Sequence, residues 1–132
     1  MTALRFAGYA AIFNHIDTGG DVIRPGAFGA LGKGQTLPLL WQHQPNQRIG
    51  TINYAREDRR GLRVIGSLSA DIEMGRKVAA LVARGRLTGL SFGYRVERAA
   101  GNRPRQLLAL HVAEISLVTA PMQPRAQVHA II

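Results

Sequence analysis

The chain has 132 residues, of which 46% are hydrophobic, and it carries a formal net charge of +9 with no cysteine. This length allows one domain with a single core, residues 1–132, and this apolar content excludes a chain that is disordered throughout. The absence of cysteine excludes disulfides and a cysteine nucleophile, and no apolar run approaches the roughly 18 residues of a membrane-spanning helix.

Short strands separated by turns are expected along most of the chain. Residues 14–20 are dense in turn formers, and the tail 122–132 has no clear period. In chain order the expected elements are a strand over 5–13, an extended piece over 21–23, a short helix over 25–31, strands over 36–43, 48–54 and 62–70, a helix between Asp71 and Gly85, and a hairpin of strands over 88–98 and 106–119.

The first expected helix is short. Pro25 fits the first turn of a helix because its missing N–H has no helical partner at that position. The helix would continue through Leu31, and the glycines Gly32 and Gly34 would stop it.

The second expected helix has clear signals at both ends. Asp71 is an acceptable N-cap, and Gly85 closes the segment. Between them an apolar stripe at helical spacing predicts the buried face. The stripe consists of Met74, Val78, Leu81 and Val82.

Many short strands with few helices point to a closed or nearly closed β-barrel, because closure removes exposed strand edges. The strand over 62–70 supports a half-buried sheet, since its apolar weight falls mainly on alternate residues starting at Leu62. The expected fold class is therefore mainly β with two to three helices.

Three polar residues lie at positions where a strand pattern favours small or apolar residues. Ser91 lies between glycines in the strand-like run 89–94, His43 ends the apolar run 37–42, and Glu114 interrupts the apolar strand 107–118. A serine hydroxyl becomes a nucleophile when a base takes its proton, and a third group orients that base. These residues are therefore candidates for a hydrolytic triad, in a chain order that such triads permit.

Each candidate also has a simpler explanation. Ser91 could be a small residue at a crowded crossing, and His43 could cap a turn before Pro45. His15 and His129 lie in a glycine-rich loop and in the tail, so we expect both to be solvated.

The third triad member has two candidates on one strand. His111 and Glu114 are three residues apart, which places them on opposite faces unless a bulge intervenes. A glutamate buried in an apolar strand needs a compensating partner. This requirement favours Glu114 as the group that orients His43, with His111 as the alternative.

A metal site is the main rival chemistry. His15, Asp17, Asp21 and His43 together offer nitrogen and oxygen ligands. They do not have helical ligand spacing, and the glycine-rich loop explains both aspartates as turn residues. We therefore expect no metal and no cofactor.

Nearly all of the positive charge comes from arginine, since Lys33 and Lys77 are the only lysines. The guanidinium fork pairs with carboxylates and phosphates, so we expect an anionic partner, either nucleic acid or an acidic protein segment. A basic surface that keeps the protein in solution is the simpler explanation. No secretory signal is visible, and together with the missing cysteines this fits an intracellular setting.

Four stretches together resemble the prohead (capsid maturation) proteases of tailed phages, which phage-derived gene transfer particles also carry. Their order and spacing both fit, and the resemblance covers the chain from about Phe6 to Val128. The four stretches are 20–28, 39–43, 89–94, and 114–118 followed by Pro121.

The resemblance implies the β-barrel fold of the herpesvirus assembly protease. It implies Ser91 as nucleophile, His43 as base and Glu114 as third member, while His111 would match the two-histidine triad of the viral enzyme. Backbone amides around Ala120 to Met122, including Pro121 between them, are the expected region of the oxyanion hole by the same analogy.

The resemblance also implies what the protein acts on. Such enzymes cleave scaffold segments and themselves inside the assembling procapsid, in the cytoplasm of the bacterial host. The expected partners are a major capsid protein precursor or a scaffold segment, with a possible homodimer, only non-specific contact with nucleic acid, and no membrane.

Two other functions compete with proteolysis. A small basic barrel could bind nucleic acid without chemistry, although such modules use exposed aromatics and only 6% of residues here are aromatic. An inactive shell component derived from the protease fold is the other alternative. The presence of all three candidate catalytic residues argues against it.

Overall fold

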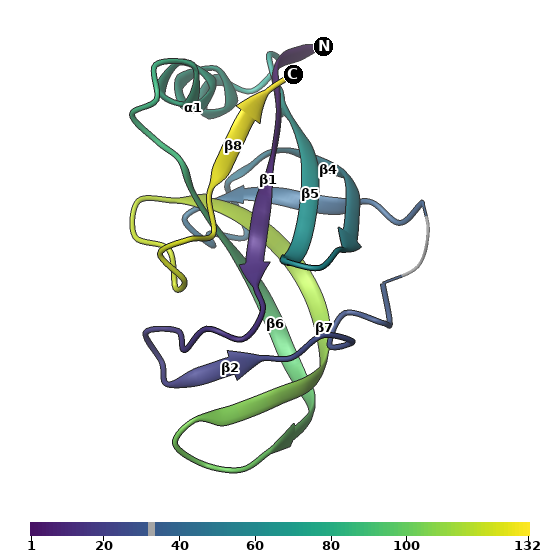
Figure 1. The fold of residues 1–132 in the computed structure, drawn as a ribbon. Coiled ribbons are helices and arrows are strands. Elements are labelled where there is room, and N and C mark those ends of the chain that lie inside the picture. The colour runs from purple at the N-terminus through teal and green to yellow at the C-terminus, as the bar shows by residue number, and fades with distance from the viewer. Residues whose placement is uncertain (32–33) are drawn as a thin grey trace.

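The computed structural model describes residues 1–31 and 34–132. Within them the chain forms strands and one helix (Figure 1). The elements are β1 (Thr2–Ile12), β2 (Asp21–Ile23), β3 (Leu37–Trp41), β4 (Arg48–Glu57), β5 (Gly61–Ser69), α1 (Glu73–Ala83), β6 (Gly89–Ala100), β7 (Arg105–Val118) and β8 (Val128–Ile131).

The strands form one eight-stranded sheet in the order β2-β7-β3-β4-β5-β1-β8, with β6 paired to β7. The longest pairing is the antiparallel β6–β7 hairpin, which Figure 1 shows curving away from the β1, β4 and β5 strands. β7 also pairs in parallel with β2 near its start and with β3 near its end. This long strand therefore connects β2 and β3 to β6.

The sheet is not closed, so the expected closed or nearly closed barrel is wrong. Near the start of β6, the bridge between Gly89 and Gln127 connects the hairpin to the segment before β8. One backbone bond flanks it on each side, from Leu90 N–H to the Ala126 carbonyl at 2.9 Å and from Val128 N–H to the Thr88 carbonyl at 2.7 Å. Beyond this point, among the described strands, β6 pairs only with β7, which leaves the sheet open.

The helix expected over 25–31 is also wrong, so the described residues hold one helix rather than two or three. Residues 25–30 form successive turns, with bonds such as Ala27 N–H to the Arg24 carbonyl at 3.1 Å. Gly26 has φ +96°, which a right-handed helix cannot contain. The Glu57 carboxylate accepts the Gly26 and Phe28 N–H groups at 2.8 and 3.0 Å and holds the turns instead. Gly32, expected to stop the helix, lies outside the described residues.

α1 is confirmed, with corrections at its start and on its face. The N-cap is Ile72, which makes no side-chain capping bond, and Asp71 instead pairs with the amino group of Met1 at 2.8 Å. Val78 and Val82 are buried as expected, whereas Leu81 is 37% exposed. The glycine expected to close the helix, Gly85, has φ +69° and ends it with backbone bonds typical of a Schellman motif.

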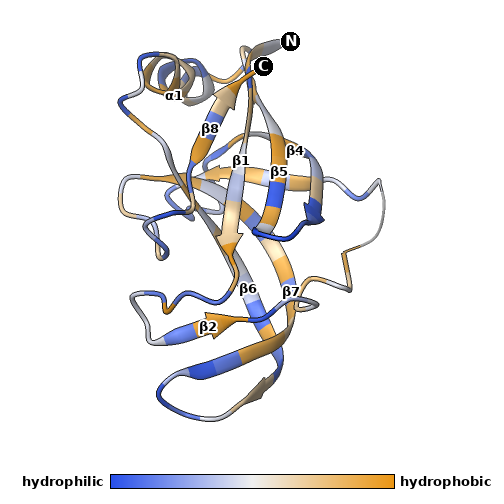
Figure 2. Cartoon of the chain, in the orientation of Figure 1, coloured by the Kyte–Doolittle hydropathy of each residue, from blue (hydrophilic) through white to orange (hydrophobic). Residues whose placement is uncertain are grey.

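The core is built from buried residues of β1, β3, β4, β5, α1 and the β6–β7 hairpin. The expected alternation in β5 is confirmed, since the residues at alternate positions from Leu62 are buried. In Figure 2 hydrophilic residues gather at the β4–β5 turn and at the outer end of the hairpin. Large side chains that are fully buried include Phe6, Leu39, Ile52, Leu62, Leu90, Leu107, Ile115 and Leu117.

The tail after Pro121 is ordered and ends in β8, which pairs with β1 in antiparallel fashion. Gln123 anchors this segment, because its buried side chain accepts the Ile12 N–H and donates to the Ile12 carbonyl, each at 2.8 Å. None of the described helices has the length and apolar character needed to cross a bilayer.

Candidate active site

His43 directly follows β3 on a turn with unusual backbone geometry. Gln42 and His43 have φ values of 52° and 59°, in the left-handed region that few non-glycine residues adopt. Three contacts hold the turn against β7 and its end. Gln42 N–H donates to the Leu117 carbonyl at 3.0 Å, His43 N–H donates to the Ser116 hydroxyl at 3.1 Å, and the Gln42 amide exchanges two bonds with Thr119.

The His43 ring meets the Glu114 carboxylate. The Nδ1 atom lies 2.5 Å from Glu114 Oε1, and Oε2 accepts the Ser116 hydroxyl at 2.7 Å. Because the Ser116 oxygen also accepts the His43 N–H, the three residues form a closed ring of hydrogen bonds. With Nδ1 engaged, Nε2 is the ring nitrogen left free to act as a base.

The carboxylate changes the acid–base behaviour of His43. Its hydrogen bond from the ring raises the pKa of His43 above the ordinary value, and its charge adds to this rise, while partial burial opposes it. The Glu114 side chain is 13% exposed and that of His43 is 42% exposed. The imidazole thus has a nearly buried anion on one side and open space on the other.

The β6–β7 pairing makes room for this carboxylate. Gly93 faces Glu114 across the ladder, and a Cβ added at Gly93 would lie 2.4 Å from Glu114 Oε1. Only glycine leaves this space free. Between Glu114 and Val112 the register shifts past Ala113, so a bulge intervenes next to the candidate third member.

His111, the alternative third member, is exposed and lies opposite Arg95 on the ladder. Within the described chain it forms no hydrogen bond or ion pair, whereas Glu114 contacts His43 directly. The geometry therefore favours Glu114 over His111 as the partner of the imidazole.

Ser91 lies on β6, opposite Ser116, and is 6% exposed. Ser91 and His43 line the same pocket, which has a volume of about 240 Å³. No hydrogen bond joins these two side chains, and the Ser91 hydroxyl has no partner within the described residues. Catalytic hydrogen bonds are often long before substrate binds, so the missing bond does not exclude Ser91 and His43 as partners. Their shared pocket places both side chains where one substrate could contact them.

The other pocket walls are mostly apolar. Met122 is the one residue of the expected oxyanion region, Ala120 to Met122, that lines the pocket. Its carbonyl accepts the Thr18 N–H at 3.1 Å, so the loop after β7 contacts the loop before β2. Besides Ser91 and His43 the lining residues are Ala10, Asp17, Ile23, Leu90, Phe92, Tyr94, Met122 and Gln123.

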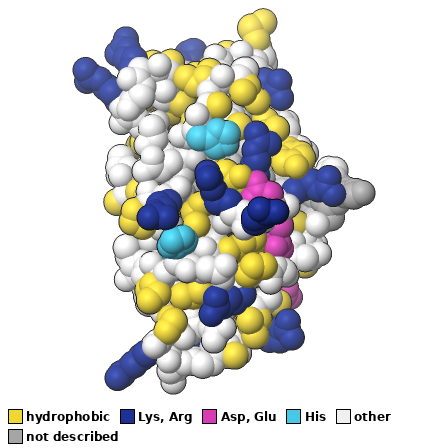
Figure 3. All heavy atoms as spheres, viewed as in Figure 1, with side chains coloured by type: hydrophobic (Ala, Val, Ile, Leu, Met, Phe, Trp, Pro, Cys, Tyr) yellow, Lys and Arg dark blue, Asp and Glu magenta, His cyan; other side chains and the backbone are white. Residues whose placement is uncertain are grey.

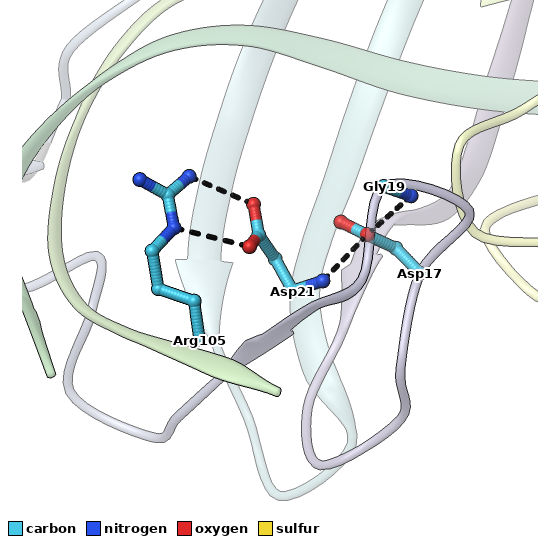
Figure 4. Close-up of polar contacts among 4 residues, drawn as sticks. All are labelled: Asp17, Gly19, Asp21 and Arg105. Carbon is cyan, nitrogen blue, oxygen red and sulfur yellow. Dashed lines mark hydrogen bonds and ion pairs between the residues drawn. The ribbon is translucent and has the colours of Figure 1, made fainter. Parts of the chain in front are cut away.

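The sequence did not single out Ser116 or the pocket role of Asp17. Ser116 follows Glu114 by two residues, and on a strand this spacing places both on one face, which is the signal that could have identified it. Asp17 is a turn residue as expected, since its Oδ1 accepts the Gly19 and Asp21 N–H groups at 2.8 and 3.0 Å (Figure 4). Its place in the pocket could not be derived from the sequence.

The residues considered as metal ligands have other partners. Asp21 forms a two-bond ion pair with Arg105, at 3.1 and 2.9 Å (Figure 4), and His15 lines a different cavity. In residues 1–31 and 34–132, no three side chains of His, Asp or Glu are grouped as a metal site would require.

A second, wider cavity, which we call the basic groove, lies between the end of β1, the β4–β5 turn and the segment that leads into β8. It has a volume of about 1210 Å³ and is lined by Arg59, Arg60 and Arg125, with His15 and His129. On the face shown in Figure 3, basic side chains and histidines surround a small group of acidic ones. The groove is therefore suited to an anionic partner.

Tyr9 forms part of the groove floor and is held in place by charged neighbours. Its hydroxyl bonds to Asp58, which is the main reason why the pKa of Tyr9 is raised. The Arg60 guanidinium lies 5.4 Å from the centre of the Tyr9 ring, and the His129 ring lies 5.8 Å from it.

Comparison with known proteins identifies the family of this chain. Residues 2–132 match the family model described as caudovirus prohead serine protease. The chain belongs to this family. This confirms the resemblance found in the sequence. The chain is 30% identical over 135 residues to the prohead protease of Enterobacteria phage HK97, and the match covers 96% of this chain but 59% of that protein.

Solved structures confirm the fold. The protease of Kaposi's sarcoma-associated herpesvirus, solved with a hexapeptide phosphonate inhibitor, superposes with a TM-score of 0.69 at 13% identity, over 95% of this chain and 63% of that chain. The protease of varicella-zoster virus gives a TM-score of 0.61 at 16% identity, over 96% of this chain and 63% of that chain. This chain and the herpesvirus proteases therefore share a fold.

Proposed function

We propose that this domain is a serine endopeptidase of the prohead maturation type. Ser91 is the nucleophile, His43 is the general base and Glu114 orients the imidazole. The observation that carries the proposal is the pocket that Ser91 and His43 share, with the His43 ring bonded to Glu114 on its other side. Membership in the prohead protease family supports the same chemistry.

The contacts suggest how the reaction would proceed. Glu114 fixes the ring with Nδ1–H bonded to the carboxylate, so Nε2 accepts the proton of Ser91 as its oxygen attacks the scissile carbonyl. The imidazolium formed is stabilised by the same carboxylate. It then gives the proton to the leaving amine, and water hydrolyses the acyl-enzyme.

The substrates we propose are capsid precursor or scaffold segments, including segments of the protease itself, within the assembling procapsid of a phage-like particle. The matched relative is a prohead protease, and the basic groove offers a surface for acidic parts of such segments. Backbone amides in residues 120–122 are the proposed donors of the oxyanion hole, because Met122 lines the pocket with Ser91.

Co-expression with the capsid precursor tests this function. Ser91→Ala removes the nucleophile without adding volume, so we expect a folded protein that leaves the precursor uncut. Ser67→Ala on β5 is the matched control and should process normally, because Ser67 lies outside the pocket. Product masses from the three proteins are compared, and continued processing by Ser91→Ala would exclude the proposed nucleophile.

The basic groove also favours a second candidate function, the binding of nucleic acid without chemistry. Phosphate binding would weaken steeply as salt concentration rises. Tight, salt-sensitive binding of single-stranded DNA together with no Ser91-dependent proteolysis would favour this function over the protease. An inactive shell component would show neither activity.

A further inference from the structure

The pocket beside Ser91 contains one carboxylate that forms no ion pair within the described residues. Asp17 lines this pocket, and it is only 7% exposed. A buried charge that lacks a cationic partner is costly, so its position in a pocket points to a cation that arrives from outside.

The two oxygens of Asp17 are used differently. Oδ1 accepts the backbone N–H groups of Gly19 and Asp21, as Figure 4 shows. Oδ2 has no partner within the described chain, and in that same part of the chain every fully buried side-chain oxygen or nitrogen has one. Oδ2 is therefore accessible, on the side chain that forms part of the pocket wall.

Within the described residues no charged side chain forms a hydrogen bond or ion pair with Asp17, although the charge of Arg105 acts on it from a distance. Asp21 and Arg105 are ion-paired to each other through two hydrogen bonds, and the His43 ring is hydrogen-bonded to Glu114. Tyr94, which also lines the pocket, remains a neutral phenol because burial first, and then the charges of Asp17 and Asp21, raise its pKa. Among the described residues the pocket lining thus contributes one aspartate and no arginine or lysine, in a protein of net charge +9.

The remaining walls define the shape of the occupant. They are apolar and come from β1, β2, β6 and the loop after β7, and the pocket volume of about 240 Å³ is that of a single side chain rather than a peptide. An occupant with an apolar stem and a cationic end satisfies both features. The apolar lining residues are Ala10, Ile23, Leu90, Phe92 and Met122.

Lysine fits this site better than arginine. Its ammonium is a compact charge that one carboxylate oxygen can accept, whereas the guanidinium fork favours two parallel acceptors. Asp17 offers only Oδ2, since Oδ1 already accepts two N–H groups.

We propose that Asp17 is a specificity-determining residue that binds a substrate lysine, the residue whose carbonyl Ser91 attacks. This inference rests on the proposed function, because it takes Ser91 as the nucleophile. The lysine stem would lie along the apolar walls, and its ammonium would pair with Asp17 Oδ2.

The first test maps the cleavage sites. The capsid precursor processed by the wild-type protein is sequenced by mass spectrometry, and we expect lysine immediately before the cut bonds. Sites without lysine there, cut in a Ser91-dependent way, would overturn the specificity proposal and leave the protease function standing.

The second test uses Asp17→Asn, which keeps an oxygen for the Gly19 and Asp21 amides but removes the charge. Peptides built on a mapped site carry lysine or the uncharged norleucine before the cut bond. We expect kcat/KM for the lysine peptide to fall about 30-fold or more, with little change for norleucine. Equal losses for both peptides would mean that Asp17 only shapes the turn, and would overturn the proposal.

Two further measurements separate charge at the pocket from other effects. Glu73→Gln on α1 removes the same charge outside the pocket and should cut both peptides like the wild type. Binding of the same two peptides to Ser91→Ala protein needs no catalysis. Suppose that the lysine peptide binds more tightly than the norleucine peptide, that this preference needs Asp17, and that no cleavage depends on Ser91. This outcome would support lysine binding by Asp17 and contradict the protease function.

Discussion

Glu114 is the residue on which the candidate triad depends most closely, because both of its carboxylate oxygens have partners. One accepts the His43 ring and the other accepts the Ser116 hydroxyl, which in turn accepts the His43 backbone N–H. The ring nitrogen, the backbone and the carboxylate are therefore fixed together. Gly93 permits this arrangement, since any side chain there would collide with the carboxylate.

Glu114→Gln should lower activity and shift its pH dependence. The carboxylate raises the pKa of His43 by stabilising the imidazolium, so the neutral amide should lower that pKa. The base must be neutral to act, and the acid limb of kcat/KM should therefore move to lower pH. We expect the maximal rate to fall about 10²–10⁴-fold, as for loss of a triad carboxylate. A pH–rate profile of precursor-peptide cleavage measures both effects.

The control for this change is Glu97→Gln, which removes an exposed carboxylate from the same β6–β7 hairpin. Its profile should match that of the wild type. If Glu114→Gln instead gave an unshifted acid limb, Glu114 would not be the group that controls His43, and His111 would have to be tested in its place.

At the residue scale the sequence indicates the candidate catalytic residues but not the residues that surround and position them. Ser91, His43 and Glu114 stand out because each interrupts a pattern that favours small or apolar residues. Ser116 and Asp17 do not stand out, since a serine in a strand and an aspartate in a glycine-rich turn are ordinary there. Their roles depend on contacts between segments far apart in the chain, which periodicity cannot show.

At the element scale, the loop between β7 and β8 is fixed mainly by Gln123. Its side chain satisfies the N–H and the carbonyl of Ile12 at the end of β1, as another strand would. This loop carries Met122 and Gln123 into the pocket and leads to β8. Attachment of the loop to β1 therefore determines one wall of the candidate active site.

Gln123→Ala should destabilise the protein by about 2–4 kcal/mol, because it leaves two buried backbone groups without partners at roughly 1–3 kcal/mol each. Urea unfolding gives this value. Gln127→Ala is the control, since that exposed side chain bonds only to the Pro124 carbonyl, and we expect about 1 kcal/mol or less. A similar loss in both variants would contradict the anchoring role of Gln123.

The elements themselves follow from the sequence where local pattern dominates. The alternation in β5 and the stripe around Val78 and Val82 correctly predict a strand and a helix. The helix expected over 25–31 fails because the Glu57 carboxylate, from a distant strand, captures the amides that a helix would use. A contact of that range leaves no signal in a local window of sequence.

At the scale of the whole molecule, the two cavities differ in the charges that line them. The basic groove is suited to an anionic partner, whereas the pocket beside Ser91 holds the Asp17 carboxylate, which forms no ion pair within the described residues. The two cavities adjoin at the loop after β7, since Ile12 lines the basic groove and Gln123, which bonds to it, lines the pocket. An acidic segment held in the groove would therefore bring its neighbouring residues close to Ser91.

Binding of an acidic precursor segment to Ser91→Ala protein should weaken as salt rises, because the groove attracts it by charge. Replacing Arg59 and Arg125 together by serine should weaken binding and reduce the salt dependence. The matched control replaces Arg84 and Arg86, which follow α1 and lie outside the groove. Fluorescence anisotropy at several salt concentrations measures this, and equal effects of both pairs would contradict a specific groove.

Overall architecture is the level at which the sequence is least informative. Short strands with turns correctly indicate a mainly β fold, and the four family stretches correctly indicate its type. Whether the sheet closes into a barrel cannot be predicted in this way, because closure depends on how far the β6–β7 hairpin pairs with β8. Here the single bridge between Gly89 and Gln127 stands where a barrel would have a full ladder.

An open sheet offers its free borders to other copies of the same chain, and this molecule limits that hazard. Its terminal strands β2 and β8 are three and four residues long, too short to template much pairing. The free flank of the longer β6 carries Arg95, Glu97 and Arg98, whose charges oppose the docking of a foreign strand. The protein should therefore resist fibril-like self-association even when many copies are packed at high concentration.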